Sequence, residues 1–195
     1  MERYSIKVVA FYTKDTPYAN IIKRLKSSLI KYGVDFYIKG YPSLQSWEEN
    51  CGIKPTFIKH CLEKFDSDIF YVDADAEFIK PPNFMEFKGT VDPKFVFIKW
   101  DTPSKSWYEL LSGSIYLPNN EQSIKIVNRW VEEQKVYPQR WDQLTLQAIL
   151  PSILDNINIL EYKWCYVLPH MKDFNIEPII IHHQASREFK GIINS

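Results

Sequence analysis

The amino-acid sequence predicts an α/β fold with a mixed, mostly parallel central sheet flanked by helices. Between residues 6 and 72, short β-branched apolar runs alternate with segments of helical periodicity, in the order strand, helix, strand, helix, strand. Crossovers of this kind place successive strands parallel, with right-handed connections. The length of 195 residues favours one domain over residues 1–195, because two independent cores would be cramped.

The first half of the chain supplies the parallel part of this sheet. Strands are expected at residues 6–11, 34–38 and 69–72, and helices at residues 18–32 and 55–65. Gly33 is placed to end the first helix, and Pro55 is placed to open the second. Residues 40–53 are expected to form a loop with one helical turn.

The second half is more mixed. Strands are expected at residues 95–100, 157–160 and 178–183, and helices at residues 121–134 and 141–150. The small residues 112–114 predict a kink that leads into a further strand at residues 115–117. Pro151 is expected to end the helix before it, because proline interrupts the helical hydrogen bonds. The chain contains no internal repeat, linker or low-complexity segment.

Composition excludes several classes of protein. Lys plus Arg and Asp plus Glu both number 24, so the chain lacks the basic excess typical of nucleic-acid binders. No apolar run reaches the length of a membrane span, and no signal-peptide cleavage site follows the first strand, so we expect a cytoplasmic protein. Three scattered cysteines are too few for a disulfide framework or a zinc site and are expected to be free thiols.

Two carboxylates follow the apolar run at residues 69–72. Asp73 and Asp75 are two positions apart in a turn, and hard oxygen ligands placed in this way suit Mg²⁺ or Mn²⁺. In parallel sheets, ligands bind beyond the carboxyl ends of the strands, which is where this pair falls. The alternative is a solvated acidic turn with no ligand.

The run IIIHHQASREFK near the C-terminus places His182 and His183 at the end of a strand. Neighbouring residues on a strand face opposite sides, so at most one of the two imidazoles should reach a metal. Arg187 and Lys190 follow and are suited to hold phosphate oxygens, although solvated C-terminal charges explain them equally well.

Asp142 and Gln143 stand at the start of the helix expected after residue 141. As a helix cap or dipole partner, Asp142 has a purely structural explanation, which its position alone favours. The functional alternative is that the carboxylate and amide are aimed at sugar hydroxyls from the helix end.

Taken in order, these features resemble the GT-A-fold glycosyltransferases, particularly the glycogenin-like and lipopolysaccharide galactosyltransferase-like group (family 8). The resemblance covers nearly the whole chain. It rests on the strand end at Thr13, Tyr18 with the helix at 25–29, Lys54-Pro55, Tyr71 to Asp75, Ser112-Gly113, Asp142-Gln143, and the histidine at 182 or 183.

The resemblance implies a metal-dependent transfer of sugar from a nucleotide-diphosphate donor. Asp73 and Asp75 match the family's DxD pair, which binds Mn²⁺ or Mg²⁺ together with the donor diphosphate. His182 matches the family's metal-binding histidine best, and His183 is the alternative. UDP-hexose is the donor that the resemblance implies, with retention of configuration favoured over inversion. The acceptor is a glycan, a lipid-linked glycan or a protein.

Further donor-site roles also come from the resemblance. Thr13 and Tyr18 fall where the family contacts the base and ribose, and Lys54 falls near the donor phosphates and sugar. Asp142 matches a residue that binds the donor-sugar hydroxyls, and Gln143 one near the anomeric carbon. The implied donor-binding set also includes Ala74, Ser112, Gly113, Arg187 and Lys190.

The chain departs from the family at two places. Ser112-Gly113 stands where related enzymes carry Asn-x-Gly, and residues 185–190 replace a Gly-x-x-Lys-Pro-Trp run after the histidine. Two other functions stay open. One is a phosphohydrolase, with Asp73 as the phosphoryl acceptor and Asp75 as its acid-base partner. The other is a protein that binds a nucleotide sugar without turnover.

Overall fold

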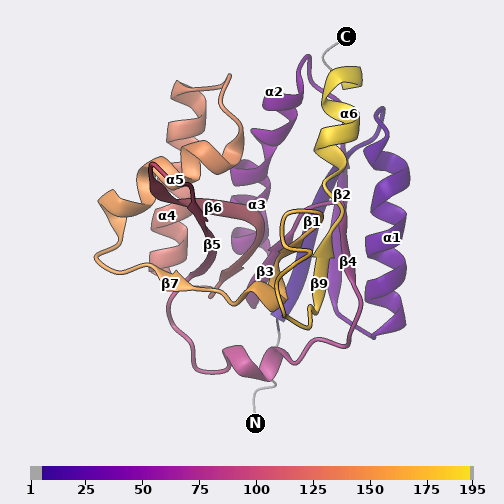
Figure 1. Cartoon of the computed structure of the whole chain (residues 1–195). Helices are drawn as coiled ribbons and strands as arrows, with labels where there is room; N and C mark the ends of the chain where they lie inside the picture. Colours follow the sequence, from indigo (N-terminus) through magenta and orange to yellow (C-terminus); the bar gives the residue numbers. More distant parts are fainter. Residues whose placement is uncertain (1–5, 194–195) are drawn as a thin grey trace.

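The structure is a computed structural model that describes residues 6–193, apart from the side chain of Ile192; both ends of the expected 1–195 domain lie outside this range. Its centre is a six-stranded sheet in the order β2-β1-β3-β6-β5-β7 (Figure 1). These strands are β1 (Ile6–Thr13), β2 (Phe36–Tyr41), β3 (Asp68–Val72), β5 (Lys94–Asp101), β6 (Ser106–Leu117) and β7 (Asn158–Ile159). Only β6 runs against the others, which confirms the mixed, mostly parallel sheet.

A smaller sheet lies next to the end of β3. It consists of β4 (Ala76–Phe78), β9 (Ile180–His182) and β8 (Tyr166–Val167), with β9 in the middle. Strand β4 begins directly after the turn that holds Asp73 and Asp75, and Ala76 pairs with His182. This pairing joins the acidic turn to the C-terminal histidines.

Helices cover both faces of the central sheet (Figure 1). The helices are α1 (Tyr18–Lys31), α2 (Trp47–Cys51), α3 (Ile53–Lys64), α4 (Glu121–Val136), α5 (Asp142–Ile153) and α6 (Ala185–Ile193). Helix α1 and the small sheet pack on one face, while α3, α4 and α5 pack on the other. Along β1, Val8 and Ala10 enter the first of these cores, and Val9 and Phe11 enter the second. Burial on both faces explains why the strand is continuously apolar.

Several element boundaries differ from the expectation, and one helix is additional. Helix α5 continues through Pro151 to Ile153. The proline lies in the last turn, so it removes only its own backbone hydrogen bond and does not interrupt the preceding turns of the helix. Helix α3 begins at Ile53, so Pro55 lies in its first turn, where no amide donor is needed. Strand β2 is shifted along the chain to Phe36–Tyr41. Helix α6, which follows the two histidines, was not expected.

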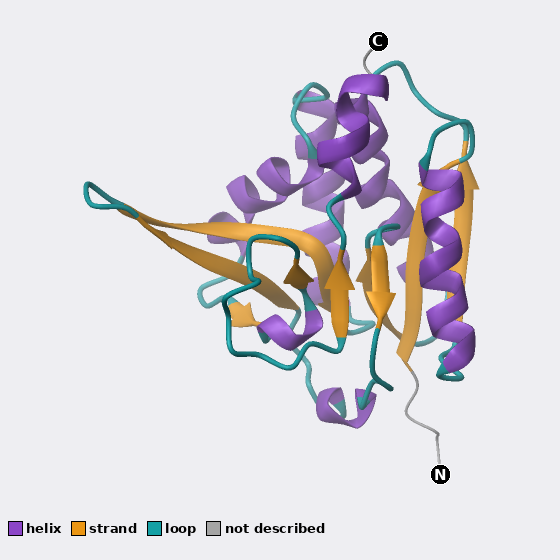
Figure 2. Ribbon diagram, turned by 45° about the vertical axis from the view of Figure 1, so that its right-hand side comes forward, coloured by secondary structure: helices purple, strands orange, loops and turns teal. Residues whose placement is uncertain are grey.

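Strands β5 and β6 continue beyond the body of the protein as a two-stranded arm (Figure 2). Their pairing extends to Asp101 opposite Ser106, and the arm ends in an exposed turn. Residues 112–114 bulge from β6, because Phe95 pairs with Ile115 while the next residue, Val96, pairs with Leu111. The expected kink is therefore a bulge within one long strand rather than the start of a strand.

No helix within residues 6–193 is both long and apolar enough to cross a lipid bilayer. The three cysteines, Cys51, Cys61 and Cys165, are free thiols, as expected.

Gly33 ends α1 in the left-handed region, with φ of +64°, and its amide and that of Val34 bond back to the last turn. Gly33→Ala should lower the free energy of unfolding by about 1 kcal/mol, since a side chain is strained in this conformation. Gly191→Ala is the control, because Gly191 is helical with no atom within 4 Å of an added Cβ. Urea denaturation measures both variants, and an equal effect would contradict the assignment.

Candidate functional site

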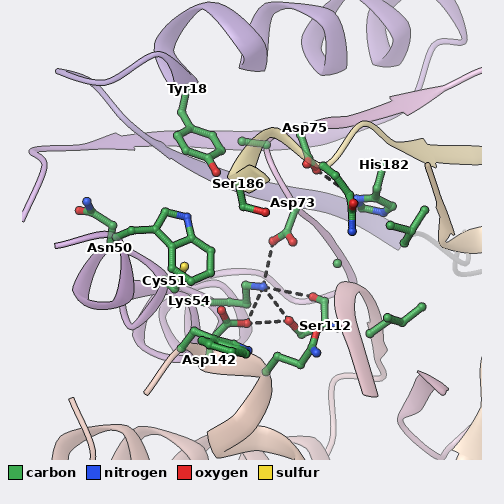
Figure 3. A pocket seen from close by; sticks show the side chains of 18 of the residues that line it. Tyr18, Asn50, Cys51, Lys54, Asp73, Asp75, Ser112, Asp142, His182 and Ser186 are labelled. Carbon is green, nitrogen blue, oxygen red and sulfur yellow. Dashed lines mark hydrogen bonds and ion pairs between the residues drawn. The ribbon is translucent and has the colours of Figure 1, made fainter. Parts of the chain in front are cut away.

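A cleft of about 460 Å³ opens at the carboxyl ends of β1 and β3 (Figure 3). This is the sheet edge at which the sequence predicts a ligand. Its walls come from β1, α1, α2, α3, the turn after β3, the arm, the β6 bulge, the start of α5 and the end of β9. The cleft therefore gathers side chains from segments that lie far apart in the sequence.

Lys54 lies at the floor of this cleft and is only 3% exposed. Its ammonium lies 2.9 Å from Asp73 Oδ1 and 2.6 Å from Asp142 Oδ2. It also donates to the carbonyl and hydroxyl oxygens of Ser112, at 3.2 and 3.1 Å, and the Ser112 hydroxyl donates to Asp142 Oδ2 at 2.7 Å. One buried cation thus connects α3, the turn after β3, the β6 bulge and α5 (Figure 3).

The groups around Lys54 hold one another in fixed protonation states. Burial alone would lower the pKa of Lys54, but Asp142 and Asp73 raise it above its usual value, so the ammonium stays charged. Burial raises the pKa of Asp73, and Lys54 opposes that shift. The Tyr71 hydroxyl donates to Asp73 Oδ1 at 2.7 Å, and burial raises the pKa of Tyr71, so this donor keeps its proton. Asp73 Oδ2 takes no part in these contacts with Lys54 and Tyr71.

Asp75 is held on the opposite side of the turn from Lys54. Its Oδ2 accepts the Ala185 amide of α6 at 3.0 Å, and its Oδ1 lies 3.3 Å from His182 Nδ1. Burial alone would raise the pKa of Asp75, but its hydrogen bond to His182 and the Ala185 amide lower it. Asp75 is therefore an ionised carboxylate beside an imidazole.

His182 is buried and points into the cleft, with Nε2 2.9 Å from the Ser114 hydroxyl. Its ring passes so close to the β6 bulge that a Cβ on Gly113 would lie 3.1 Å from Cε1. The absence of a side chain at Gly113 therefore leaves room for the imidazole.

The charge of His182 is set by its neighbours. Burial lowers the pKa of His182, but Cys165 and Asp75 outweigh this effect and raise the pKa to about 10.

The two neighbouring histidines point in different directions, as strand geometry requires. His183 Nε2 lies 2.9 Å from Glu77 Oε2 and does not line the cleft. Asp73, Asp75 and His182 each offer one ligand atom, and these atoms all lie within 4.8 Å of one another. Two carboxylates and an imidazole form a donor set that suits Mn²⁺ or Mg²⁺.

Asp142 is the first residue of α5, but it does not cap the helix. The N-cap is Trp141, and the Asp142 carboxylate turns toward Lys54 and Ser112 instead of the helix amides. The backbone carbonyl of Asp142 accepts the buried Trp130 indole N–H at 3.1 Å, which fixes the start of the helix. Gln143 lies beside it, with Nε2 donating to Glu109 Oε1 at 2.9 Å.

The remaining predicted donor residues divide into two groups. Those that line the cleft are Thr13, Tyr18, Ala74, Ser112 and Gly113. Arg187 and Lys190 lie on α6 outside the lining: Arg187 contacts His170 at 2.5 Å, and Lys190 pairs with Glu48 at 2.6 Å. The Lys190 ammonium also lies over the rings of Trp47 and Trp141. In this arrangement the two cations hold α6 against its neighbours.

Several residues of the cleft were missed by sequence reasoning. They include Trp100 and Glu109 of the arm, and Trp47, Asn50, His170 and Gln184. The strand expected at residues 95–100 was the signal for one strand of the arm, but it carried no information about the cleft. Gln184 has a φ of +51° and a buried Oε1 without a hydrogen-bond partner within the described chain.

Solved structures share this fold. A crystal structure of a glycosyltransferase involved in the glycosylation of the major capsid of PBCV-1 matches with a TM-score of 0.69 and 16% identity, over 98% of this chain and 100% of that one. The apo form of the glycosyltransferase GlyE from Streptococcus pneumoniae TIGR4 matches with a TM-score of 0.61 and 12% identity, over 92% of this chain and 54% of that one. A second GlyE structure has a TM-score of 0.55, also at 12% identity.

These similarities establish a glycosyltransferase fold for the chain, which spans about half the length of GlyE. No protein-family model and no curated protein matches the sequence.

Replacing Lys54 tests the buried charge network. Lys54→Met leaves two carboxylates without their shared cation, and we expect the free energy of unfolding to fall by about 3 kcal/mol or more. Lys59→Met is the matched control on the same helix, where an exposed pair with Glu63 at 3.8 Å should contribute less than about 0.5 kcal/mol. Urea denaturation at pH 7 compares the two, and similar losses would contradict a special role for Lys54.

Proposed function

We propose that the chain is a metal-dependent glycosyltransferase that moves a sugar from a nucleotide-diphosphate donor. The convergence of Asp73, Asp75 and His182 at the carboxyl end of β3 carries this proposal. In a glycosyltransferase fold, a cation at this edge lies where a donor diphosphate can approach it. Mn²⁺ or Mg²⁺ is the proposed ion, and His182 rather than His183 is the proposed imidazole ligand, since His183 turns toward Glu77.

The charges of the cleft support a need for a metal. The described lining holds four carboxylates, Asp73, Asp75, Glu109 and Asp142. Against them stand two cations: Lys54, which is already paired twice, and the His182 imidazolium, which must lose its proton to bind a metal. An anionic diphosphate would be repelled from this surface without an added cation. When bound, a divalent ion supplies positive charge that stabilises the departing nucleotide.

The protein's own residues have distinct roles in the proposed reaction. Lys54 fixes the orientation of Asp73 and Asp142 and does not itself grip phosphate, because its donors are engaged. Asp142 and Gln143 orient the donor sugar from the start of α5. Thr13 and Tyr18, at the end of β1 and the start of α1, face the nucleoside.

We favour transfer with retention of configuration. The bond between the anomeric carbon and the diphosphate oxygen breaks, and the acceptor oxygen bonds to that carbon on the same face. Attack on the same face needs no carboxylate nucleophile, and because the acceptor proton passes to the departing phosphate oxygen, it needs no separate general base. UDP-hexose is the proposed donor, and residues 1–195 form the proposed catalytic domain.

Removing single ligands tests the metal site. Asp75→Ala and His182→Ala should each abolish Mn²⁺ binding, measured by calorimetry, and Mn²⁺-dependent release of UDP from a UDP-hexose. His183→Ala is the matched control and should retain both properties, because its imidazole faces Glu77. Full activity in Asp75→Ala would sink the assignment. Phosphomonoester hydrolysis without binding of UDP would favour the phosphohydrolase alternative.

Metal affinity should also depend on pH. His182 binds a cation only as neutral imidazole, but its pKa is about 10, so a proton must leave when the metal binds. Because this pKa lies above the working range, the affinity for Mn²⁺ should rise about tenfold per pH unit from pH 6 to pH 8.

Calorimetry in two buffers of different ionisation enthalpy measures the proton released. The variant His182→Asn should bind more weakly and lose most of the pH dependence, because an amide does not titrate. An affinity in the unchanged protein that is the same at pH 6 and pH 8 would contradict the proposed exchange of proton for metal.

A further inference from the structure

The arm formed by β5 and β6 has two different faces. Trp100 pairs directly with Trp107 across the arm, and Ile98 pairs with Glu109. Directly paired residues share a face, and residues two apart on a strand share it too. One face therefore carries Trp100, Trp107, Glu109 and, further inward, Leu111. Tyr108 belongs to the opposite face.

The first of these faces is continuous with the cleft. Leu111, Glu109 and Trp100 line the cleft, and Trp107 follows them outward along the arm. Trp107 is 39% exposed, and the ammonium of Lys105 lies 4.9 Å from its ring centroid. These side chains form a strip that leads from the proposed donor site outward along the arm to the solvent.

Glu109 is held in a fixed position at the inner end of this strip. The Trp100 indole N–H donates to Glu109 Oε2 at 2.6 Å, and Gln143 Nε2 donates to Oε1 at 2.9 Å. Each carboxylate oxygen can accept a second hydrogen bond, so Glu109 retains acceptor capacity toward the cleft. Its contact with Gln143 connects it to the residue proposed to lie near the anomeric carbon.

The chemistry of the strip fits a carbohydrate. A sugar ring has an apolar C–H face and a polar hydroxyl edge, so it can stack on an indole while donating hydroxyls to a carboxylate. An aliphatic chain would gain from the indoles, but it would bury the remaining acceptor capacity of Glu109 without supplying a further donor. The alternation of indole and carboxylate therefore favours a hydroxyl-rich acceptor.

We propose that the face of the arm formed by Trp100, Trp107 and Glu109 is the acceptor subsite and that the acceptor is a glycan. This proposal rests on the glycosyltransferase function proposed above and narrows its acceptor class. Trp107 is the outer stacking surface, and Glu109 is a positioning residue that orients the acceptor hydroxyl beside Gln143.

Neighbouring residues on opposite faces of the arm provide the test. The probes are maltotetraose, cellotetraose, chitotetraose, mannotetraose and lactose, each titrated at millimolar concentration with Mn²⁺ and UDP present and followed by saturation-transfer NMR. Trp107→Ala should weaken binding of the best probe about tenfold. Tyr108→Ala is the matched control, with 61% of Tyr108 exposed on the other face, and should change binding less than about twofold.

Donor hydrolysis without an acceptor separates this proposal from the proposed function. Tyr108→Ala should release UDP at the rate of the unchanged protein, because Tyr108 lies on the other face of the arm and does not line the cleft. Loss of hydrolysis in the unchanged protein would count against the glycosyltransferase function itself. The acceptor proposal is overturned if hydrolysis is intact and no probe binds, if both variants weaken binding equally, or if transfer occurs only to a peptide or a lipid.

Discussion

The buried ammonium of Lys54 is the constraint on which the rest of the cleft depends. Asp73 and Asp142 both contact this ammonium, at 2.9 and 2.6 Å, and the two carboxylates would repel each other without a shared cation. Lys54 also fixes Ser112, so the β6 bulge takes its place in the same network. The proposed metal ligand Asp73 and the proposed sugar-binding residue Asp142 are thus set relative to each other before any ligand arrives.

The β6 bulge has a second effect on the other side of the turn. The Gly113 carbonyl accepts the Asp73 amide at 2.9 Å, while the missing side chain at Gly113 admits the His182 ring. The hydroxyl of Ser114 then lies 2.9 Å from that ring. A three-residue irregularity in one strand therefore positions a carboxylate and an imidazole at once. The strand continues outward from the bulge to form the arm, which connects the proposed donor site to the proposed acceptor subsite.

The sequence predicted those features that depend on residues adjacent in the chain. The apolar run before Asp73 defined a strand buried on both faces and placed the acidic pair at its end. His182 could not be separated from His183, because the direction of each ring depends on the pairing of the short strand β9 with β4 and β8. Lys54 was expected near phosphates, but its partners come from distant segments that spacing does not reveal. Glu109 was missed because only the register of β5 and β6 turns it toward Gln143.

The central claim is that one divalent ion bridges this chain and a nucleotide diphosphate. A crystal soaked with Mn²⁺ and UDP, with anomalous diffraction recorded for manganese, tests it most directly. We expect one strong anomalous peak coordinated by Asp73, Asp75 and His182, with both UDP phosphates beside it and the His183 ring still turned toward Glu77. Manganese bound elsewhere, or UDP bound in the cleft with no metal between its phosphates and Asp75, would contradict the account.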